Sequence, residues 1–133
     1  WNGGFKDGKG VMAPEHGGEL PFSVGTRFEG AAGTNPEEVL GAALAGCFSM
    51  ALSLGLERAG LTPKQLTTKA AVKLERGEGG FSITSIALEL EAVVPGADPA
   101  KVEEIATATK SGCPVSKALA AVPEITLKTH VTT

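Results

Sequence analysis

The chain has 133 residues, 42% of them apolar, which is enough for one hydrophobic core and too little for two full domains. The net charge is −3 and the twelve lysines and arginines form no cluster, which disfavours binding to nucleic acid or to an anionic membrane surface. Two cysteines are too few for the disulfide framework of a small secreted protein. We therefore expect a single cytoplasmic domain over residues 1–133, with the five phenylalanines as the large pieces of its core.

The first third of the chain has the pattern of short β-strands. The pair Asp7-Gly8 is a hairpin signal, residues 15–18 are a polar turn, and residues 21–28 are rich in strand-forming residues. We expect three short antiparallel strands in this region.

A long helix is predicted to begin after Asn35. Asn35 is a favourable N-cap, Pro36 suits the first helical position, and Glu38 stands three residues after the cap. The helix should continue to Gly60, which gives about 24 residues and a length of roughly 36 Å. The uncharged stretch 39–56 just reaches the length of a membrane span, but its many Gly, Ala and Ser residues would gain little from insertion. A central helix buried on all sides is the simpler interpretation.

The rest of the chain predicts a hairpin, two further helices and a last strand. In chain order these are strands over 66–76 and 81–94, a helix over 99–112, a short helix from Pro114, and a strand over 125–131. Because strands and helices are segregated, we expect an α+β fold in which antiparallel β-sheets pack around the long buried central helix.

The two cysteines occupy different kinds of position. Cys47 lies in the middle of the long helix, where burial would raise its pKa and leave it an inert, small apolar residue. Cys113 stands at the N-cap of the short helix, where backbone N–H groups and the helix dipole favour a thiolate. On these grounds alone, Cys113 is the better nucleophile.

Metal and nucleotide sites are not indicated. His16 falls in a turn and His130 on the polar side of the last strand, so both should be exposed, and with two distant cysteines they make a poor zinc-binding pattern. The glycines follow no phosphate-binding or dinucleotide-binding fingerprint. The sequence therefore predicts neither a metal nor a bound cofactor.

Four short motifs carry a family resemblance. They are Thr26-Arg27-Phe28-Glu29, Thr34-Asn35-Pro36-Glu37-Glu38, Ala45-Gly46-Cys47-Phe48 and Cys113-Pro114-Val115-Ser116. Each motif is weak alone, but in this order and spacing they resemble the family of osmotically inducible protein C (OsmC) and organic hydroperoxide resistance protein (Ohr). The resemblance covers nearly the whole chain, and the opening residues 1–10 favour the OsmC branch.

The resemblance implies a stress-response thiol peroxidase that reduces organic hydroperoxides and needs no cofactor. Cys47 would attack the O–O bond and become a sulfenic acid, and Cys113 would resolve it as an intramolecular disulfide. These roles reverse the ranking drawn from the helix positions. Arg27 would stabilise the thiolate, and Glu37 would hold Arg27 by a salt bridge. A dithiol, of the lipoyl type in related enzymes, would reduce the disulfide.

Other interpretations stay open without the resemblance. Arg27 is then a solvated strand residue, and Glu37 is a favourable charge in the first turn of a helix. The protein could also be a non-enzymatic stress protein that binds a hydrophobic ligand or senses redox state. A disulfide oxidoreductase is a third possibility, which the absence of a Cys-x-x-Cys pair disfavours.

The distance between two of these residues predicts a dimer. Glu37 and Cys47 are ten residues apart on one helix, hence about 15 Å along its axis, so one Arg27 cannot easily serve both within a subunit. Two copies of the helix that cross antiparallel near Ala42, where small residues are concentrated, would bring Glu37 of one chain beside Cys47 of the other. The resemblance likewise implies an interwoven homodimer, and we expect two composite sites in it.

Overall fold

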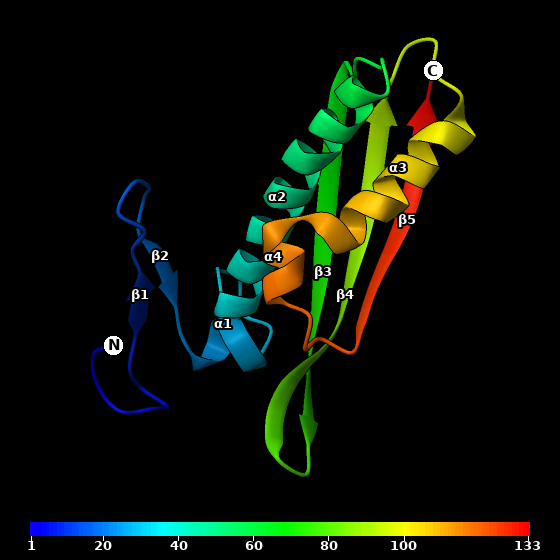
Figure 1. The fold of residues 1–133 in the computed structure, drawn as a ribbon. Helices are drawn as coiled ribbons and strands as arrows, with labels where there is room; N and C mark the ends of the chain where they lie inside the picture. The colour runs from blue at the N-terminus through cyan, green and yellow to red at the C-terminus, as the bar shows by residue number, and fades with distance from the viewer. The chain divides into compact units, whose positions relative to one another are not determined.

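The computed structural model describes residues 1–133, which form two compact units, residues 1–40 and 41–133 (Figure 1). The elements, in chain order, are β1 (Gly10–Met12), β2 (Leu20–Phe22), α1 (Val24–Phe28), α2 (Pro36–Arg58), β3 (Gln65–Gly77), β4 (Gly80–Val93), α3 (Pro99–Gly112), α4 (Pro114–Ala118) and β5 (Glu124–Thr132). The fold class is α+β, as predicted. The organisation as one domain stays a prediction.

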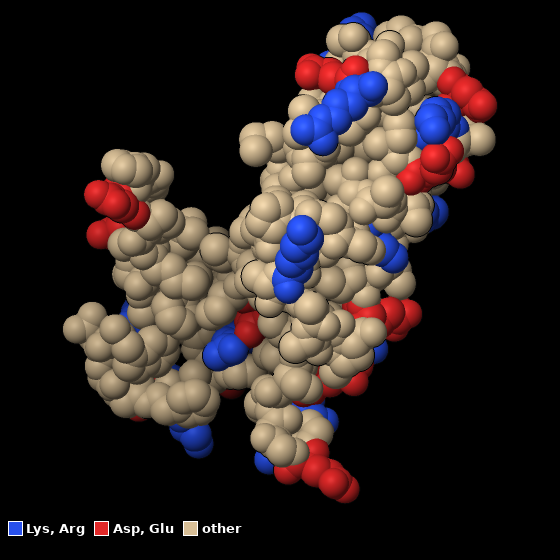
Figure 2. All heavy atoms as spheres, in the orientation of Figure 1, with Lys and Arg blue, Asp and Glu red and all other residues tan.

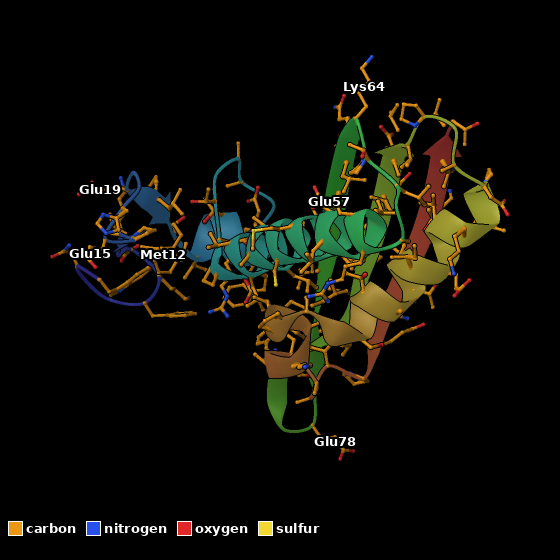
Figure 3. The ribbon with its side chains drawn as sticks, turned by 45° about the horizontal axis from the view of Figure 1, so that its top comes forward. Met12, Glu15, Glu19, Glu57, Lys64 and Glu78 are labelled. Carbon is orange, nitrogen blue, oxygen red and sulfur yellow. The ribbon has the colours of Figure 1, made fainter.

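The first unit begins with a small hairpin. β1 and β2 pair antiparallel with Gly10 opposite Phe22, and Glu15 and Glu19 lie in the turn between them (Figure 3). The ring of Trp1 packs against that of Phe22, with centroids 5.6 Å apart. A Cβ atom on Gly10 would lie 2.5 Å from Phe22 and 2.6 Å from Trp1. Glycine at this position therefore lets both aromatic rings lie against the strand.

The strand predicted over residues 21–28 is confirmed only at residues 21 and 22, which lie in β2, and is wrong beyond them, because residues 24–28 form helix α1. Ser23 and Thr26 make a reciprocal capping box: the Ser23 hydroxyl accepts from the Thr26 N–H at 3.3 Å, and the Thr26 hydroxyl accepts from the Ser23 N–H at 2.9 Å. These local hydrogen bonds outweigh the strand preference of the segment. Arg27 consequently lies on a helical turn.

Helix α2 begins where its capping signals predict and ends slightly earlier. The Asn35 side chain accepts a hydrogen bond from the Glu38 N–H at 2.8 Å. The helix ends at Arg58, and Gly60, with a φ of +77°, reverses the chain. The Leu61 N–H then donates to the Leu56 carbonyl at 2.9 Å, which closes the C-terminus of the helix.

Only one face of α2 is buried in the single chain. Its length and composition would allow it to cross a membrane, but four of its side chains, spaced four residues apart, are at most 1% exposed in the core of the second unit. These are Leu44, Phe48, Leu52 and Leu56. On another face Met50 is 77% exposed and Leu54 is 49% exposed. The prediction of a helix buried on all sides is therefore wrong for one chain.

The second unit is a three-stranded sheet with helices α2, α3 and α4 on one face (Figure 1). β3 and β4 form the predicted antiparallel hairpin, and Glu78 lies at its turn (Figure 3). β4 and β5 pair parallel, with Ile86 opposite Ile125, so the prediction of an antiparallel sheet is wrong at β5. The reason is that α3 and α4 carry the chain back across the sheet, and a helical crossover of this kind makes the next strand parallel.

The core of the second unit lies between the sheet and its helices. Alternate residues of β4 are at most 2% exposed, namely Ile86, Leu88, Leu90 and Ala92. Of the phenylalanines only Phe48 is fully buried, while Phe5 and Phe81 are more than half exposed, which corrects the expectation that all five fill the core. Charged side chains are scattered over the face of the molecule in Figure 2, and no cluster of one sign is visible there.

Candidate functional site

The two cysteines, far apart in sequence, meet in the second unit. Cys47 lies on α2 and is partly buried, whereas Cys113 is 1% exposed and forms the N-cap of α4. Both are free thiols, and Cys47 packs against the buried cluster that contains Cys113. The packing of α2 against the junction of α3 and α4 thus creates a thiol pair, in which one sulfur is partly open to solvent and the other is enclosed.

The surroundings of Cys113 oppose ionisation. Burial raises the pKa of the Cys113 thiol, a hydrogen bond from the Ser116 N–H at 3.3 Å opposes that shift, and the contact with Cys47 raises the pKa further. The ranking of Cys113 as the better nucleophile, drawn from its place at a helix N-terminus, is therefore wrong. Desolvation outweighs the backbone donor. Cys113 suits the part of a neutral second thiol that reacts after its neighbour.

Ser116 holds the enclosed thiol in place, a role that was not predicted from the sequence. Its side chain is buried, and its hydroxyl donates to the Lys110 carbonyl near the end of α3 in a very short hydrogen bond. The Cys113 N–H donates to the Thr109 carbonyl at 3.2 Å. The turn from α3 to α4 is therefore fixed on both sides of Cys113. The signal was present as the fourth residue of the Cys113-Pro114-Val115-Ser116 motif.

Arg27 and Glu37 form the predicted ion pair within the first unit. The Arg27 Nη2 atom lies 2.6 Å from Glu37 Oε1, and Arg27 Nε lies 3.1 and 3.2 Å from the two carboxylate oxygens. The Glu37 side chain is 9% exposed and that of Arg27 is 36% exposed. The guanidinium also lies over the Phe28 ring, 5.1 Å from its centroid. The pair is a bidentate fork that fixes the plane of the guanidinium.

An apolar hollow of about 460 Å³ adjoins Arg27 in the first unit. Its lining residues are mostly aromatic or aliphatic and are Trp1, Gly3, Phe5, Phe22, Ser23, Val24, Arg27 and Phe28. The phenylalanines were expected in the core, and this hollow was missed because a sequence pattern does not show which aromatic side chains the hairpin and α1 bring together. The hollow places one cation at the edge of an apolar surface.

The chain matches the family model for OsmC-like proteins over residues 28–128. It is 51% identical over 129 residues to Peroxiredoxin OsmC of Escherichia coli strain K12, a match that covers 96% of this chain and 89% of that protein. It is 31% identical over 99 residues to the organic hydroperoxide resistance protein of Xanthomonas axonopodis pv. citri strain 306, which covers 74% of this chain and 68% of that protein. The higher identity is to the OsmC branch, as the opening residues predicted.

A solved structure supports the fold. The crystal structure of an OsmC-like protein from Mycoplasma pneumoniae has a TM-score of 0.73 to this chain at 17% sequence identity, and the match covers 95% of this chain and 96% of that one. The family model extends over most of the chain, and a relative with half of its residues identical extends over nearly all of it. This protein therefore belongs to the OsmC family.

Proposed function

We propose that this protein is a thiol peroxidase that reduces organic hydroperoxides to alcohols, with Cys47 as the attacking thiol and Cys113 as the resolving thiol. The observation that carries the proposal is the contact between one partly exposed thiol and one buried thiol. It occurs in a chain whose relatives are named peroxiredoxin and organic hydroperoxide resistance protein. Cys47 is the thiol that a hydroperoxide can reach from solvent.

The first step consumes the hydroperoxide. The Cys47 thiolate attacks the terminal oxygen of the substrate, the O–O bond breaks, and the alkoxide takes up a proton and leaves as the alcohol. Cys47 is oxidised to a sulfenic acid, and the hydroperoxide is reduced by two electrons. Cys113 stays a protonated thiol during this step, because burial raises its pKa. It therefore does not compete with Cys47 for the substrate.

The second step forms a disulfide. The Cys113 sulfur attacks the sulfenic sulfur of Cys47, its thiol proton is released, and the hydroxyl group of the sulfenic acid leaves as water. Cys47 packs against the buried cluster that contains Cys113, so the second thiol lies near the site of the first step. A dithiol, for which a lipoyl-type compound is our candidate, then reduces the disulfide and becomes oxidised itself. This returns both cysteines to thiols.

Arg27 supplies the positive charge in this proposal. Glu37 accepts hydrogen bonds from Nε and Nη2 of Arg27, which leaves the N–H groups of Nη1 for a thiolate or a peroxide oxygen. A cation held in this way favours the ionised form of a nearby thiol and stabilises the charge that develops on the departing oxygen. The apolar hollow beside Arg27 favours a substrate with a hydrocarbon group over hydrogen peroxide.

The proposal includes a homodimer in which the Arg27–Glu37 pair of one chain serves the thiol pair of the other. The open apolar face of α2, with Met50 and Leu54, is the surface that a second α2 would cover. Ala42, Ala43 and Gly46 are also exposed and are small enough for a close helix crossing. Glu37 and Cys47 lie about 15 Å apart along the helix axis, a separation that an antiparallel crossing would offset.

A steady-state assay tests the activity. Purified protein is given cumene hydroperoxide or hydrogen peroxide, with dithiothreitol or dihydrolipoamide as reductant. We expect many turnovers per chain and faster consumption of cumene hydroperoxide. Consumption that stops after one equivalent, in the presence of reductant, would instead support the redox-sensing alternative.

A mixed dimer tests the shared site. Chains with Cys47→Ser are refolded together with chains with Glu37→Ala, and native mass spectrometry measures the fraction of mixed dimers. One of the two sites in each mixed dimer then combines a wild-type Cys47 with a wild-type Glu37, so activity should return in proportion to that fraction. Mixed dimers no more active than their parents would show that Glu37 acts within its own chain.

A further inference from the structure

We propose that Asn35 is a positioning residue that holds the Arg27–Glu37 pair in its reactive geometry; this inference rests on the proposed function of Arg27. Asn35 uses both ends of its amide. Its Oδ1 atom accepts from the Glu38 N–H at 2.8 Å, and its Nδ2 atom donates to the Thr26 carbonyl at 3.2 Å. One side chain is thus bonded to the residue directly after Glu37 and to the residue directly before Arg27.

Helix capping explains only half of this arrangement. An N-cap needs a side-chain acceptor for the first free N–H groups of the helix, and Ser, Thr or Asp provide one as well as Asn does. The second bond needs a donor on the same side chain, and an uncharged side chain of this length that offers both an acceptor and donors is an amide. The bond to Thr26 therefore adds a link from the start of α2 to α1.

The loop between α1 and α2 also lies against Thr26. Gly33 adopts a φ of +144°, and a Cβ atom there would lie 2.8 Å from the Thr26 side chain. The Thr34 hydroxyl donates to the Pro21 carbonyl at 2.6 Å, and the Ala31 N–H donates to the Gly25 carbonyl at 3.0 Å. The loop is therefore fastened to the segment 21–26, and Asn35 is its last attachment before α2.

Arg27 needs this support because its own helix cannot provide it. α1 has five residues, none of them buried, and a helix so short has little stability of its own. The Arg27–Glu37 pair is partly open to solvent, and ion pairs of this kind contribute little to holding two segments together. Loss of the Asn35 donor should let the α1 backbone shift, so that the guanidinium meets Glu37 in several orientations instead of one.

Asn35→Ser separates the two functions of the side chain. Serine still caps α2, but it is too short to reach the Thr26 carbonyl and adds no charge. We expect the rate constant for oxidation of Cys47 by cumene hydroperoxide to fall about tenfold. The pH profile of thiol alkylation should move to higher pH, because the thiolate loses part of its cationic neighbour. The melting temperature should change little.

The matched control removes a different helix cap. Asp98 caps α3 by accepting a hydrogen bond from the Ala100 N–H at 3.0 Å, and it takes no part in the proposed reaction. Asp98→Ala should lower stability by more than Asn35→Ser does and leave the oxidation rate of Cys47 unchanged. An equal loss of rate in both variants would show that weakening any helix cap slows the enzyme, and it would overturn the positioning role.

A double-mutant cycle with Arg27→Ala decides how Asn35 acts. In the Arg27→Ala background, Asn35→Ser should cause no further loss of rate, since its effect passes through the guanidinium. A full tenfold loss in both backgrounds would overturn the proposal. If Arg27→Ala alone leaves the rate unchanged, the role of Arg27 fails and the positioning role falls with it. The two failures are distinguished by which single variant keeps its activity.

Arginine side-chain NMR gives a readout that does not depend on activity. The chain has three arginines, Arg27, Arg58 and Arg76, so the Nε–H signal of Arg27 can be assigned by substitution. In the wild-type protein this proton is bonded to Glu37 and should exchange slowly with water. In Asn35→Ser it should exchange faster. An unchanged Arg27 signal would show that Asn35 does not hold the pair.

Discussion

The thiol pair and the Arg27–Glu37 pair are held in opposite ways. Cys47 and Cys113 are placed by a packed core, in which neighbouring side chains such as Phe48 are fully buried. Arg27 lies on a short helix without buried residues and is oriented by directional hydrogen bonds. A packed core tolerates the loss of one polar contact, whereas a hydrogen-bonded frame changes geometry when one is lost. The positions of the two sulfurs should therefore tolerate substitutions of neighbouring residues, whereas the orientation of the Arg27 guanidinium should be sensitive to them.

The largest expected effect comes from the cysteines themselves. Cys47→Ser should abolish hydroperoxide consumption, because Cys47 is the partly exposed thiol that donates two electrons to the hydroperoxide. Cys113→Ser should still consume hydroperoxide without reductant: one equivalent leaves Cys47 as a sulfenic acid, and a second converts it to a sulfinic acid. Peptide mass spectrometry identifies the products, and in the wild-type protein it should find an intramolecular Cys47–Cys113 disulfide. Equal activity of the two variants would contradict the assigned roles.

The second-largest effect is expected from Arg27→Lys. Lysine keeps the charge but lacks the planar fork that binds Glu37 through two nitrogens and still offers a third. The oxidation rate of Cys47 should fall about 100-fold, which is the usual cost of removing one oriented donor from an active site. Stopped-flow measurement with cumene hydroperoxide gives the rate, and Lys110→Arg, a change outside the pair, serves as control. An unchanged rate and an unchanged thiol titration would remove Arg27 from the mechanism.

A substitution in the core of the second unit should lower stability more than activity, whereas a substitution in the first unit should lower activity more than stability. Leu52→Ala leaves a cavity in the core of the second unit and should lower the free energy of unfolding by about 3 kcal/mol. The folded variant should keep most of its rate of hydroperoxide reduction. Thr34→Val loses the hydrogen bond to the Pro21 carbonyl and should cost only about 1 kcal/mol. The rate of hydroperoxide reduction by Thr34→Val should nevertheless fall several-fold, because the hydrogen-bonded segment that positions Arg27 loses one attachment. Urea unfolding and peroxide kinetics on both variants check this; a rate loss that follows stability would contradict it.

The smallest effect concerns the pH response of the two thiols. Burial raises the pKa of Cys113, so at neutral pH iodoacetamide should modify Cys47 first. A group with a raised pKa in the folded state keeps its proton after the unfolded chain has lost it. The native protein should therefore lose stability as pH rises through and above the range in which an ordinary thiol ionises. Cys113→Ala should flatten this alkaline loss. Faster alkylation of Cys113 than of Cys47 would contradict the assignment.

Signals local in sequence predicted much of the fold. Asn35 and Pro36 marked the start of α2, Asp98 and Pro99 the start of α3, and the alternation of β4 its buried face. Each of these depends on residues within one or two turns of each other, which is the range that a sequence pattern reports.

Features that depend on distant parts of the chain were missed. The parallel pairing of β5 follows from the path of α3 and α4 over the sheet, and the raised pKa of Cys113 follows from side chains that cover it in space. Helix α1 was missed for a different reason, because a capping box that begins at Ser23 overrode the strand preference of the residues around it. The Arg27–Glu37 pair was found through the family resemblance, since nothing in its spacing requires contact.

The buried position of Cys113 limits how long the enzyme stays active in excess hydroperoxide. Under the proposed mechanism the Cys47 sulfenic acid has two fates: attack by Cys113, or attack on a second hydroperoxide, which yields a sulfinic acid and an alcohol. The first route slows at acidic pH, because a thiol with a raised pKa is then almost wholly protonated. The second route grows with oxidant concentration. The Cys113 sulfur, which does not react with the hydroperoxide in this mechanism, therefore decides how many cycles one molecule completes before it is permanently inactivated.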